Sequence, residues 1–366
     1  YKTQRETVLV PLFKEIDAVK NKKDLVKLIS EFHANGAGSF FSFYVDVDEK
    51  KSDMYVAQLY QSGTGLPDVE YYSKDDDRSK EIREKYVQHI ANMFKLIDTD
   101  AQAAEGIAQK IMSIETALAK VSNTRLENRD PMKTYNKMTT GGLQKLTNVF
   151  DWNVYFEGMG IKDPQIVVVA QPKFFEGMNK IIDETSLDDL KAYLKWNVLR
   201  RGAGALSSAF VNESFDFNGK FLNGQKVLQP RWKRILANVN GSLGELLGEI
   251  YVAEVFPPEA KEKAKNIVSG LLASMGESIK NNDWMSDATK EQALKKLSTF
   301  GVKIGYPDKW TDYSELEISR GSYFKNLQNA MAWARKDNMK KLGKPIDRTE
   351  WGMTPQTVNA YYNPVM

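Results

Sequence analysis

The chain has 366 residues, of which 42% are hydrophobic and 27% are charged. This composition is typical of a folded globular protein and excludes a disordered chain. Its 51 basic and 48 acidic residues nearly cancel and alternate along predicted helices. A nucleic-acid-binding protein would instead concentrate basic residues on one stripe. No apolar run reaches the roughly 20 residues that span a bilayer. We therefore expect no nucleic-acid partner and no membrane span in this chain.

Cysteine and histidine limit the chemistry of the chain further. The absence of cysteine excludes disulfides, thiolate metal ligands and a cysteine nucleophile. The only two histidines, His33 and His89, each lie in a predicted helix without a second histidine four residues on. A catalytic zinc site usually needs two histidines and a carboxylate. We therefore interpret both histidines as structural and predict no catalytic residue and no metal ligand in this chain.

Helical patterns dominate the first third of the chain. Apolar residues spaced three and four apart predict helices over 8–19 and 25–34, the second ended by Asn35-Gly36. An aromatic run at 39–47 predicts a strand, and the glycines and proline of 63–68 predict a loop. Two long amphipathic helices are predicted between 78 and 121, with a break near Thr99-Asp100. The acidic run 75–77 favours the first turn of that helix over a calcium loop.

The rest of the chain also reads as helical, with a few breaks. We predict a break at 139–142, a buried strand at 166–170 and a helix from Ser186 to about Leu199. Glycines within 215–228 predict a loop or hairpin. Pro257-Pro258 opens a further helix, and another begins near Ser286. The predicted fold class is mainly α, with a few short strands.

Two glycine pairs could suggest a nucleotide site, but neither has the required context. Gly63-Thr64-Gly65 and Gly202-Ala203-Gly204 lack the third glycine and a preceding strand. No Gly-x-Ser-x-Gly turn marks a serine nucleophile. We interpret both glycine pairs as turns or helix breaks.

The C-terminal residues Val358 to Tyr362 have strand propensity, followed by a turn signal. A strand beside a cleft can bind an extended peptide through its main chain, and the amide of Asn359 could add a donor and an acceptor. The pattern by itself favours the simpler interpretation, an edge strand with a solvent-facing asparagine.

Several segments together resemble the neprilysin and endothelin-converting-enzyme family of zinc metallopeptidases. Val358-Asn359-Ala360-Tyr361-Tyr362 is similar to the family's substrate-binding strand, which stands shortly before its H-E-x-x-H zinc helix. Other matching segments follow the family order: Phe40 to Asp46, Gly63 to Tyr72, Arg129 to Thr139, Phe256 to Lys261, Trp284 to Lys290, and Ile304 to Pro307. Six such matches in order make chance a poor explanation.

The resemblance implies two mainly helical lobes around a central cavity. Residues 1–282 would form the helical lid, and 283–366 would form an incomplete first part of a thermolysin-like catalytic domain with a short substrate-binding strand. By the same match, Asn359 and the main chain of Ala360 would bind the peptide backbone of a substrate, and Tyr361 would brace the strand. The family's zinc ligands, general-base glutamate and later catalytic histidine have no counterpart in this sequence.

The resemblance therefore predicts part of a zinc-dependent endopeptidase that cleaves small peptides. This chain would be inactive alone and would need the remaining C-terminal catalytic part of the same protein, so we expect a fragment or one half of a cleaved protein. The absence of cysteine resembles bacterial members more than animal ones and predicts export to the periplasm or cell surface of a bacterium. The alternative is a non-catalytic peptide-binding or interaction lobe derived from the same family.

Overall fold

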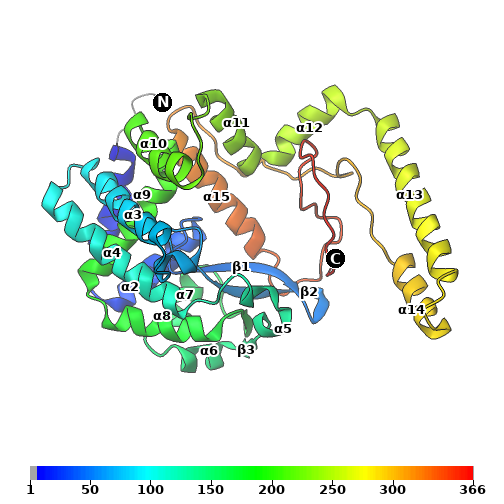
Figure 1. Cartoon of the computed structure of the whole chain (residues 1–366), viewed down its shortest axis with the longest axis horizontal. Coiled ribbons are helices and arrows are strands. Elements are labelled where there is room, and N and C mark those ends of the chain that lie inside the picture. Colours follow the sequence, from blue (N-terminus) through cyan, green and yellow to red (C-terminus); the bar gives the residue numbers. More distant parts are fainter. Residues whose placement is uncertain (1–5, 366) are drawn as a thin grey trace. The chain divides into compact units, whose positions relative to one another are not determined.

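The computed structural model describes residues 6–365 and divides the chain into two compact units (Figure 1). Unit 1 comprises Tyr1–Pro230 and Leu316–Ile346, and unit 2 comprises Arg231–Glu315 and Asp347–Met366. Each unit is therefore built from two separate stretches of chain. The predicted boundary after residue 282 concerns the lobes of a longer protein, and it stays a prediction.

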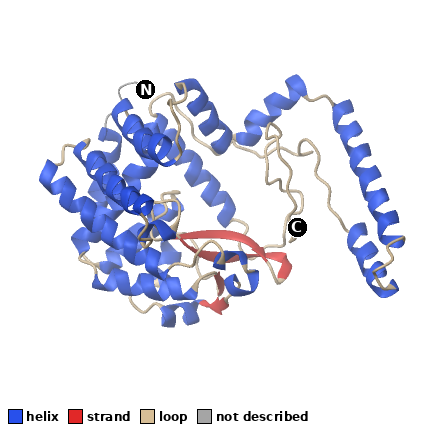
Figure 2. Cartoon of the chain, viewed as in Figure 1, coloured by secondary structure: helices blue, strands red, loops and turns tan. Residues whose placement is uncertain are grey.

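Helices make up most of unit 1, as the apolar spacing predicts (Figure 2). Its α-helices are α1 Val10–Asp17, α2 Lys22–Ala34, α3 Asp77–Lys95, α4 Ala101–Val121, α5 Pro131–Thr134, α6 Thr140–Leu146, α7 Trp152–Gly158, α8 Pro172–Glu184, α9 Leu187–Gly202, α10 Ser208–Ser214 and α15 Tyr323–Met339. Its shorter helical turns are η1 Glu6–Leu9, η2 Val69–Tyr72, η3 Glu127–Arg129, η4 Ala203–Ala205 and the π-helix η5 Phe215–Leu222. No helix within residues 6–365 is both long and apolar enough to cross a bilayer.

Polar side chains fix the helix ends at the places that the sequence predicts. Asp76, Asp100 and Ser186 each accept a hydrogen bond from a main-chain N–H in the first turn of α3, α4 and α9. Such caps satisfy donors that have no partner within the helix. Gly36, with φ +78°, follows the end of α2 in the left-handed conformation that glycine adopts without strain. These starts and stops confirm the predicted helices.

Among the described residues, unit 1 contains one four-stranded sheet with the order β1-β2-β4-β3. The strands are β1 Phe41–Asp48, β2 Lys51–Gln61, β3 Lys137–Thr139 and β4 Ile166–Val169. β1 and β2 form an antiparallel hairpin, β2 runs parallel to β4, and β3 runs antiparallel to β4. The predicted strands at 39–47 and 166–170 are confirmed, whereas β2 and β3 were not predicted.

Helix α15 covers the outer edge of β1. The Asn338 amide accepts a hydrogen bond from Val45 N–H (2.9 Å) and donates one to Val45 C=O (2.8 Å). Arg335 Nη1 donates to Phe43 C=O at 2.9 Å. An uncovered strand edge is a template for aggregation, so these side chains take the place of a neighbouring strand.

Aromatic rings form the centre of the unit 1 core. The ring of Phe41 lies 4.8–5.6 Å from the rings of His33, Phe150, Trp152, Tyr155 and Phe175. These partners come from α2, α7, α8 and the loop before α7, so one residue of β1 ties the sheet to three helices. Burying an aromatic side chain of this size contributes on the order of 2 kcal/mol.

Unit 2 contains α11 Arg231–Ser242, α12 Gly244–Val255, α13 Pro258–Lys280 and α14 Asp287–Ser298. The helices predicted from Pro257-Pro258 and from Ser286 are confirmed as α13 and α14. Apolar side chains of α13 are not covered, since Ile267 is 66% and Leu271 64% exposed, and Trp284, between α13 and α14, is 76% exposed. All fully buried hydrophobic side chains among the described residues belong to unit 1. Unit 2 therefore has no closed core of its own within this chain.

One local prediction was wrong. Residues 215–222, predicted as loop or hairpin, form a π-helix, in which Gly219 packs against the Phe215 ring. A Cβ at Gly219 would lie 2.4 Å from Phe215 Cδ2, so the glycine serves packing rather than a turn. The predicted break at 139–142 is confirmed as the junction of β3 and α6, where Thr139 Oγ1 accepts a hydrogen bond from Gly142 N–H. Gly141 and Gly142 lie inside α6.

Candidate functional site

The predicted substrate-binding residues Asn359, Ala360 and Tyr361 lie in unit 2, and all three are exposed. Asn359 Oδ1 accepts a hydrogen bond from Ala360 N–H (2.8 Å), and Tyr361 Oη accepts one from Gly352 N–H (3.0 Å). The side-chain Nδ2 of Asn359 has no partner among residues 6–365. The segment thus presents the Asn359 amide donor to its surroundings, whereas the main-chain N–H groups of Asn359 and Ala360 are bonded to Thr357 C=O and Asn359 Oδ1.

The strand predicted at Val358–Tyr362 is not formed in this structure. No described strand pairs with these residues, and Val358 is fully exposed. A β-strand requires a hydrogen-bonded neighbour, which strand propensity alone does not supply. Upstream, Gln356 anchors the segment by donating to Asn240 Oδ1 (2.5 Å) and Gly244 C=O (2.9 Å).

Both histidines are buried structural residues, as the sequence predicts. His33 Nδ1 lies 2.7 Å from the Tyr155 hydroxyl, and its Nε2 accepts from Ser39 N–H at 3.1 Å. Burial lowers the pKa of His33 to about 3. His89 stacks on the Phe217 ring, and its Nδ1 lies 2.9 Å from Glu213 Oε1. Within the described residues, no three His, Asp or Glu side chains are grouped so as to hold a metal ion.

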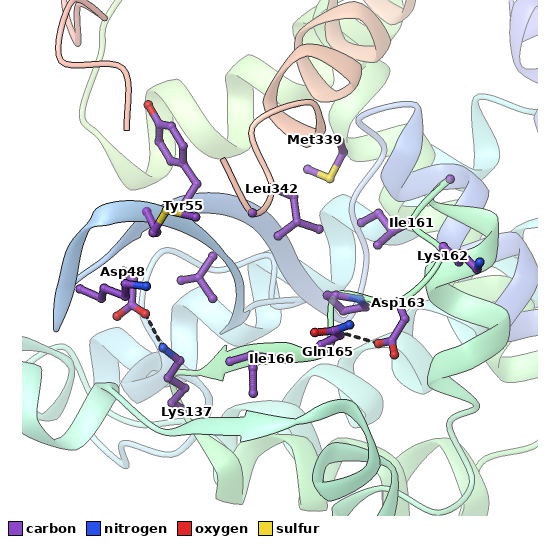
Figure 3. A pocket seen from close by; sticks show the side chains of 16 residues that line it. Asp48, Tyr55, Lys137, Ile161, Lys162, Asp163, Gln165, Ile166, Met339 and Leu342 are labelled. Atoms are coloured by element: carbon purple, nitrogen blue, oxygen red, sulfur yellow. Dashed lines mark hydrogen bonds and ion pairs between the residues drawn. The ribbon is translucent and has the colours of Figure 1, made fainter. Parts of the chain in front are cut away.

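A pocket of about 570 Å³ opens on unit 1 between β2, the loop at 160–165 that leads into β4, and the end of α15 (Figure 3). Its apolar lining consists of Met54, Val56, Ile161, Ile166, Met339 and Leu342. At one end, Asp48 accepts hydrogen bonds from Lys137 (2.5 Å) and the Tyr135 hydroxyl (2.6 Å). Burial opposes the ionised form of Asp48, but these bonds lower its pKa overall.

The two carboxylates of this pocket both accept hydrogen bonds from neighbouring residues. Asp163, at the other end, accepts from Gln165 N–H (2.7 Å) and from the Thr140 hydroxyl (3.0 Å). The Tyr135–Asp48–Lys137 bonds join the β1–β2 hairpin to β3. The pocket is thus an apolar hollow with a hydrogen-bonded carboxylate at each end.

A buried carboxylate that sequence reasoning missed holds the loop at 63–68. Glu115, in α4, is fully buried. Its Oε2 accepts from Gly65 N–H (2.9 Å), Tyr72 Oη (2.5 Å) and Tyr86 Oη (2.9 Å). Its Oε1 accepts from Trp196 Nε1 at 3.1 Å. Burial raises the pKa of Glu115, and the nearby Arg200 opposes that rise.

The Glu115 network explains why the loop at 63–68 must carry glycine. A Cβ at Gly65 would lie 1.8 Å from Tyr86 Oη, which real side chains never permit. The available sequence signal was Glu115 itself, which stands on the apolar face of α4 between Ile111 and Leu118. A charge at such a position is buried only when it is paired or hydrogen-bonded.

Comparison with known proteins identifies the family. A family model described as Peptidase family M13 matches residues 2–307, most of the chain. Human endothelin-converting enzyme 1 is 29% identical over 359 residues, covering 95% of this chain and 46% of that protein. Neprilysin-3 of Drosophila melanogaster is 28% identical, covering 88% of this chain and 43% of that protein. The chain thus spans less than half the length of these relatives.

Solved structures agree with this assignment. The zinc metalloprotease Zmp1 of Mycobacterium tuberculosis, in its open state, is 35% identical, with a TM-score of 0.91 over 99% of this chain and 56% of that one. PepO of Lactobacillus rhamnosis, at 21% identity and a TM-score of 0.85, shares the fold. Together, the family model over residues 2–307 and this structural agreement establish that the chain belongs to peptidase family M13.

Proposed function

We propose that this chain is the N-terminal part of a zinc-dependent endopeptidase that cleaves small peptides within a closed two-lobe cavity. In this proposal, residues 1–282 supply the lid, and the segment at 358–362 supplies the strand that binds the substrate backbone. The observation that carries the proposal is the family match over residues 2–307, together with the exposure of Asn359 and Ala360. The Zmp1 structure in complex with an inhibitor, 35% identical, supports a peptidase rather than a binding protein.

Zinc is the expected metal of the complete protein, but the described residues of this chain do not fit a zinc site. His33 and His89 are each buried and each bonded to a residue of the core, Tyr155 and Glu213 respectively. Turning either ring toward a metal would break those bonds. We therefore place the zinc ligands in the remaining C-terminal part of the longer protein, and we expect this chain alone to be inactive.

The uncovered helices of unit 2 support a further part of the same protein as partner. Leu246, Ile250 and Val255 of α12 and Ile267 and Leu271 of α13 are 44–66% exposed. Apolar surface of this kind is normally covered by another part of a folded protein. The relatives are about twice as long as the matched region. In this proposal, the exposed apolar side chains of α12 and α13 are covered by the remaining C-terminal part of the same protein.

The proposed substrate role of Asn359 is tested in the complete protein. Replacing Asn359 by alanine removes one side-chain hydrogen bond to the peptide backbone. We expect kcat/KM for a short peptide to fall, because the transition state loses about 1–3 kcal/mol of binding free energy. The zinc content should stay unchanged. The control is Asn281→Ala, at an exposed end of α13, which should keep full activity. Unchanged kcat/KM in Asn359→Ala would remove the proposed role.

The second candidate function is a non-catalytic peptide-binding or interaction lobe. The same assay separates the two, because that alternative predicts peptide binding without turnover even in the complete protein. We also propose export to the periplasm or cell surface of a bacterium, which is supported by the bacterial origin of Zmp1 and PepO. Fractionation of the native host would test this location.

A further inference from the structure

Helix α12 carries a seat for the C-terminal segment of unit 2. All twelve residues of this helix are described, and only Gly244 and Gly248 are buried. They stand four residues apart and therefore lie on one face of the helix. A Cβ at Gly244 would lie 2.5 Å from Thr354 Cγ2, and one at Gly248 would lie 2.7 Å from Pro355 Cδ. The two glycines thus form a flat face on which Thr354 and Pro355 rest, and we call it the glycine seat.

Gln356 fixes the position of the segment on the glycine seat. Its side-chain Nε2 donates to Asn240 Oδ1 of α11 (2.5 Å) and to Gly244 C=O of α12 (2.9 Å). A Cβ at Gly248 would lie 3.0 Å from Gln356 Oε1, so the amide lies directly against that glycine. A hydrogen bond restricts both the distance and the direction of its donor. The two bonds of one side chain therefore set the register of the segment along α12.

Short main-chain bonds connect Gln356 to Asn359. Thr357 N–H donates to Thr354 C=O (3.0 Å), and the hydroxyl groups of these two threonines lie 2.8 Å apart. Asn359 N–H in turn donates to Thr357 C=O (3.1 Å). The backbone from the glycine seat to Asn359 is thus restricted at each step.

The chain that follows Asn359 is also held within unit 2. Tyr361 Oη accepts a hydrogen bond from Gly352 N–H, and the Tyr362 ring stacks on the Phe300 ring with 5.7 Å between the ring centroids. Asn359 itself is exposed. The segment therefore presents an exposed amide between two fixed ends.

We propose that Gln356 is a positioning residue for the peptide substrate, because its bonds to the glycine seat set where the free Nδ2 of Asn359 meets the substrate backbone. The inference rests on the proposed function, in which Asn359 binds that backbone. Gln356 acts through Asn359 and need not touch the substrate, since its own amide is bonded to α11 and α12. Displacing a substrate-binding group by about 1 Å can cost about a hundredfold in rate. Loss of the two Gln356 bonds should therefore be felt three residues further along the chain.

The test is a double-mutant cycle in the complete protein, with kcat and KM measured for a short peptide. Gln356→Ala should lower kcat/KM by about tenfold when Asn359 is present, and by less than about twofold when Asn359 is already alanine. A merely structural role would give the same loss in both backgrounds. The zinc content should stay at about one per molecule in every variant. The control is Gln102→Ala, at an exposed position of α4, which should keep full activity.

A glycine variant tests the seat itself. Gly248→Ala adds a Cβ that would lie 2.7 Å from Pro355 Cδ, so the segment has to move and kcat/KM should again fall by about tenfold. The matched control is Gly106→Ala within α4, where an added Cβ meets nothing within 4 Å, and kcat/KM should stay unchanged. Both changes replace a helical glycine by a better helix former, so only the contact with the segment differs.

The outcomes separate this inference from the proposed function. A loss of activity in Asn359→Ala without one in Gln356→Ala would overturn the positioning role and leave the proposed function standing. Equal losses from Gln356→Ala in the two backgrounds would do the same. Unchanged kcat/KM in Asn359→Ala would overturn the proposed role of Asn359, and the positioning role of Gln356 with it.

Discussion

Replacing Glu115 by alanine is expected to lower the free energy of unfolding by about 3–5 kcal/mol, the cost of breaking a buried charged network by removing one member. The change leaves the N–H of Gly65 and Trp196 and the hydroxyls of Tyr72 and Tyr86 without their acceptor. Urea unfolding followed by far-ultraviolet circular dichroism measures the difference.

Two further variants make this result specific to Glu115. Glu115→Gln keeps the shape but turns an amide donor toward groups that already donate, so we expect an intermediate loss. Glu84→Ala, at an exposed site of α3, should change stability by no more than about 0.5 kcal/mol. A loss in Glu115→Ala no larger than that of Glu84→Ala would show that the network does not hold the loop at 63–68.

Acid is expected to destabilise the chain through His33. The unfolded chain protonates this imidazole near its ordinary pKa of 6.5, whereas the folded chain does so only near pH 3. Protons therefore favour the unfolded state. The contribution of His33 to stability is complete above pH 6.5 and is lost as the pH falls toward 3. The slope is about 1.4 kcal/mol per pH unit, and the whole effect is on the order of 5 kcal/mol.

Comparison with His33→Gln isolates this contribution from the other titrating groups. Glu115, whose pKa is raised, acts in the opposite direction, but it is present in both proteins. Between about pH 7.5 and about pH 5, the unchanged chain should lose about 2 kcal/mol more than His33→Gln. The measurement is urea unfolding at each pH. Parallel pH profiles of the two proteins would contradict the assignment of His33 as a buried neutral residue.

The sequence predicts those elements whose signals are local. The helix starts at Asp76, Asp100 and Ser186 follow from short polar side chains that cap the first turn. Pro258 likewise marks the beginning of α13 because proline is favoured in the first turn of a helix. The buried strand β4 follows from a run of β-branched residues ended by Pro172.

The elements that the sequence does not predict depend on partners distant in the chain. β2 is identified by its pairing with β1 and β4. Helix α15 was not predicted either, and it is positioned by the hydrogen bonds of Asn338 to Val45. Gly219 signalled a turn, although its small size serves the packing of Phe215 within a π-helix. The segment at 358–362 has the propensity of a strand, but the described chain offers it no neighbour. The Glu115 network likewise joins residues from three α-helices, the short helix η2 and a loop.

The zinc content of the purified chain tests the account most directly. After extensive exchange into metal-free buffer, metal analysis should find close to zero zinc per chain, because His33 and His89 are both bonded within the core. The complete protein, treated in the same way, should retain about one zinc per molecule. One tightly held zinc in this chain by itself would contradict the proposal that the catalytic metal is bound by the remaining part of the protein.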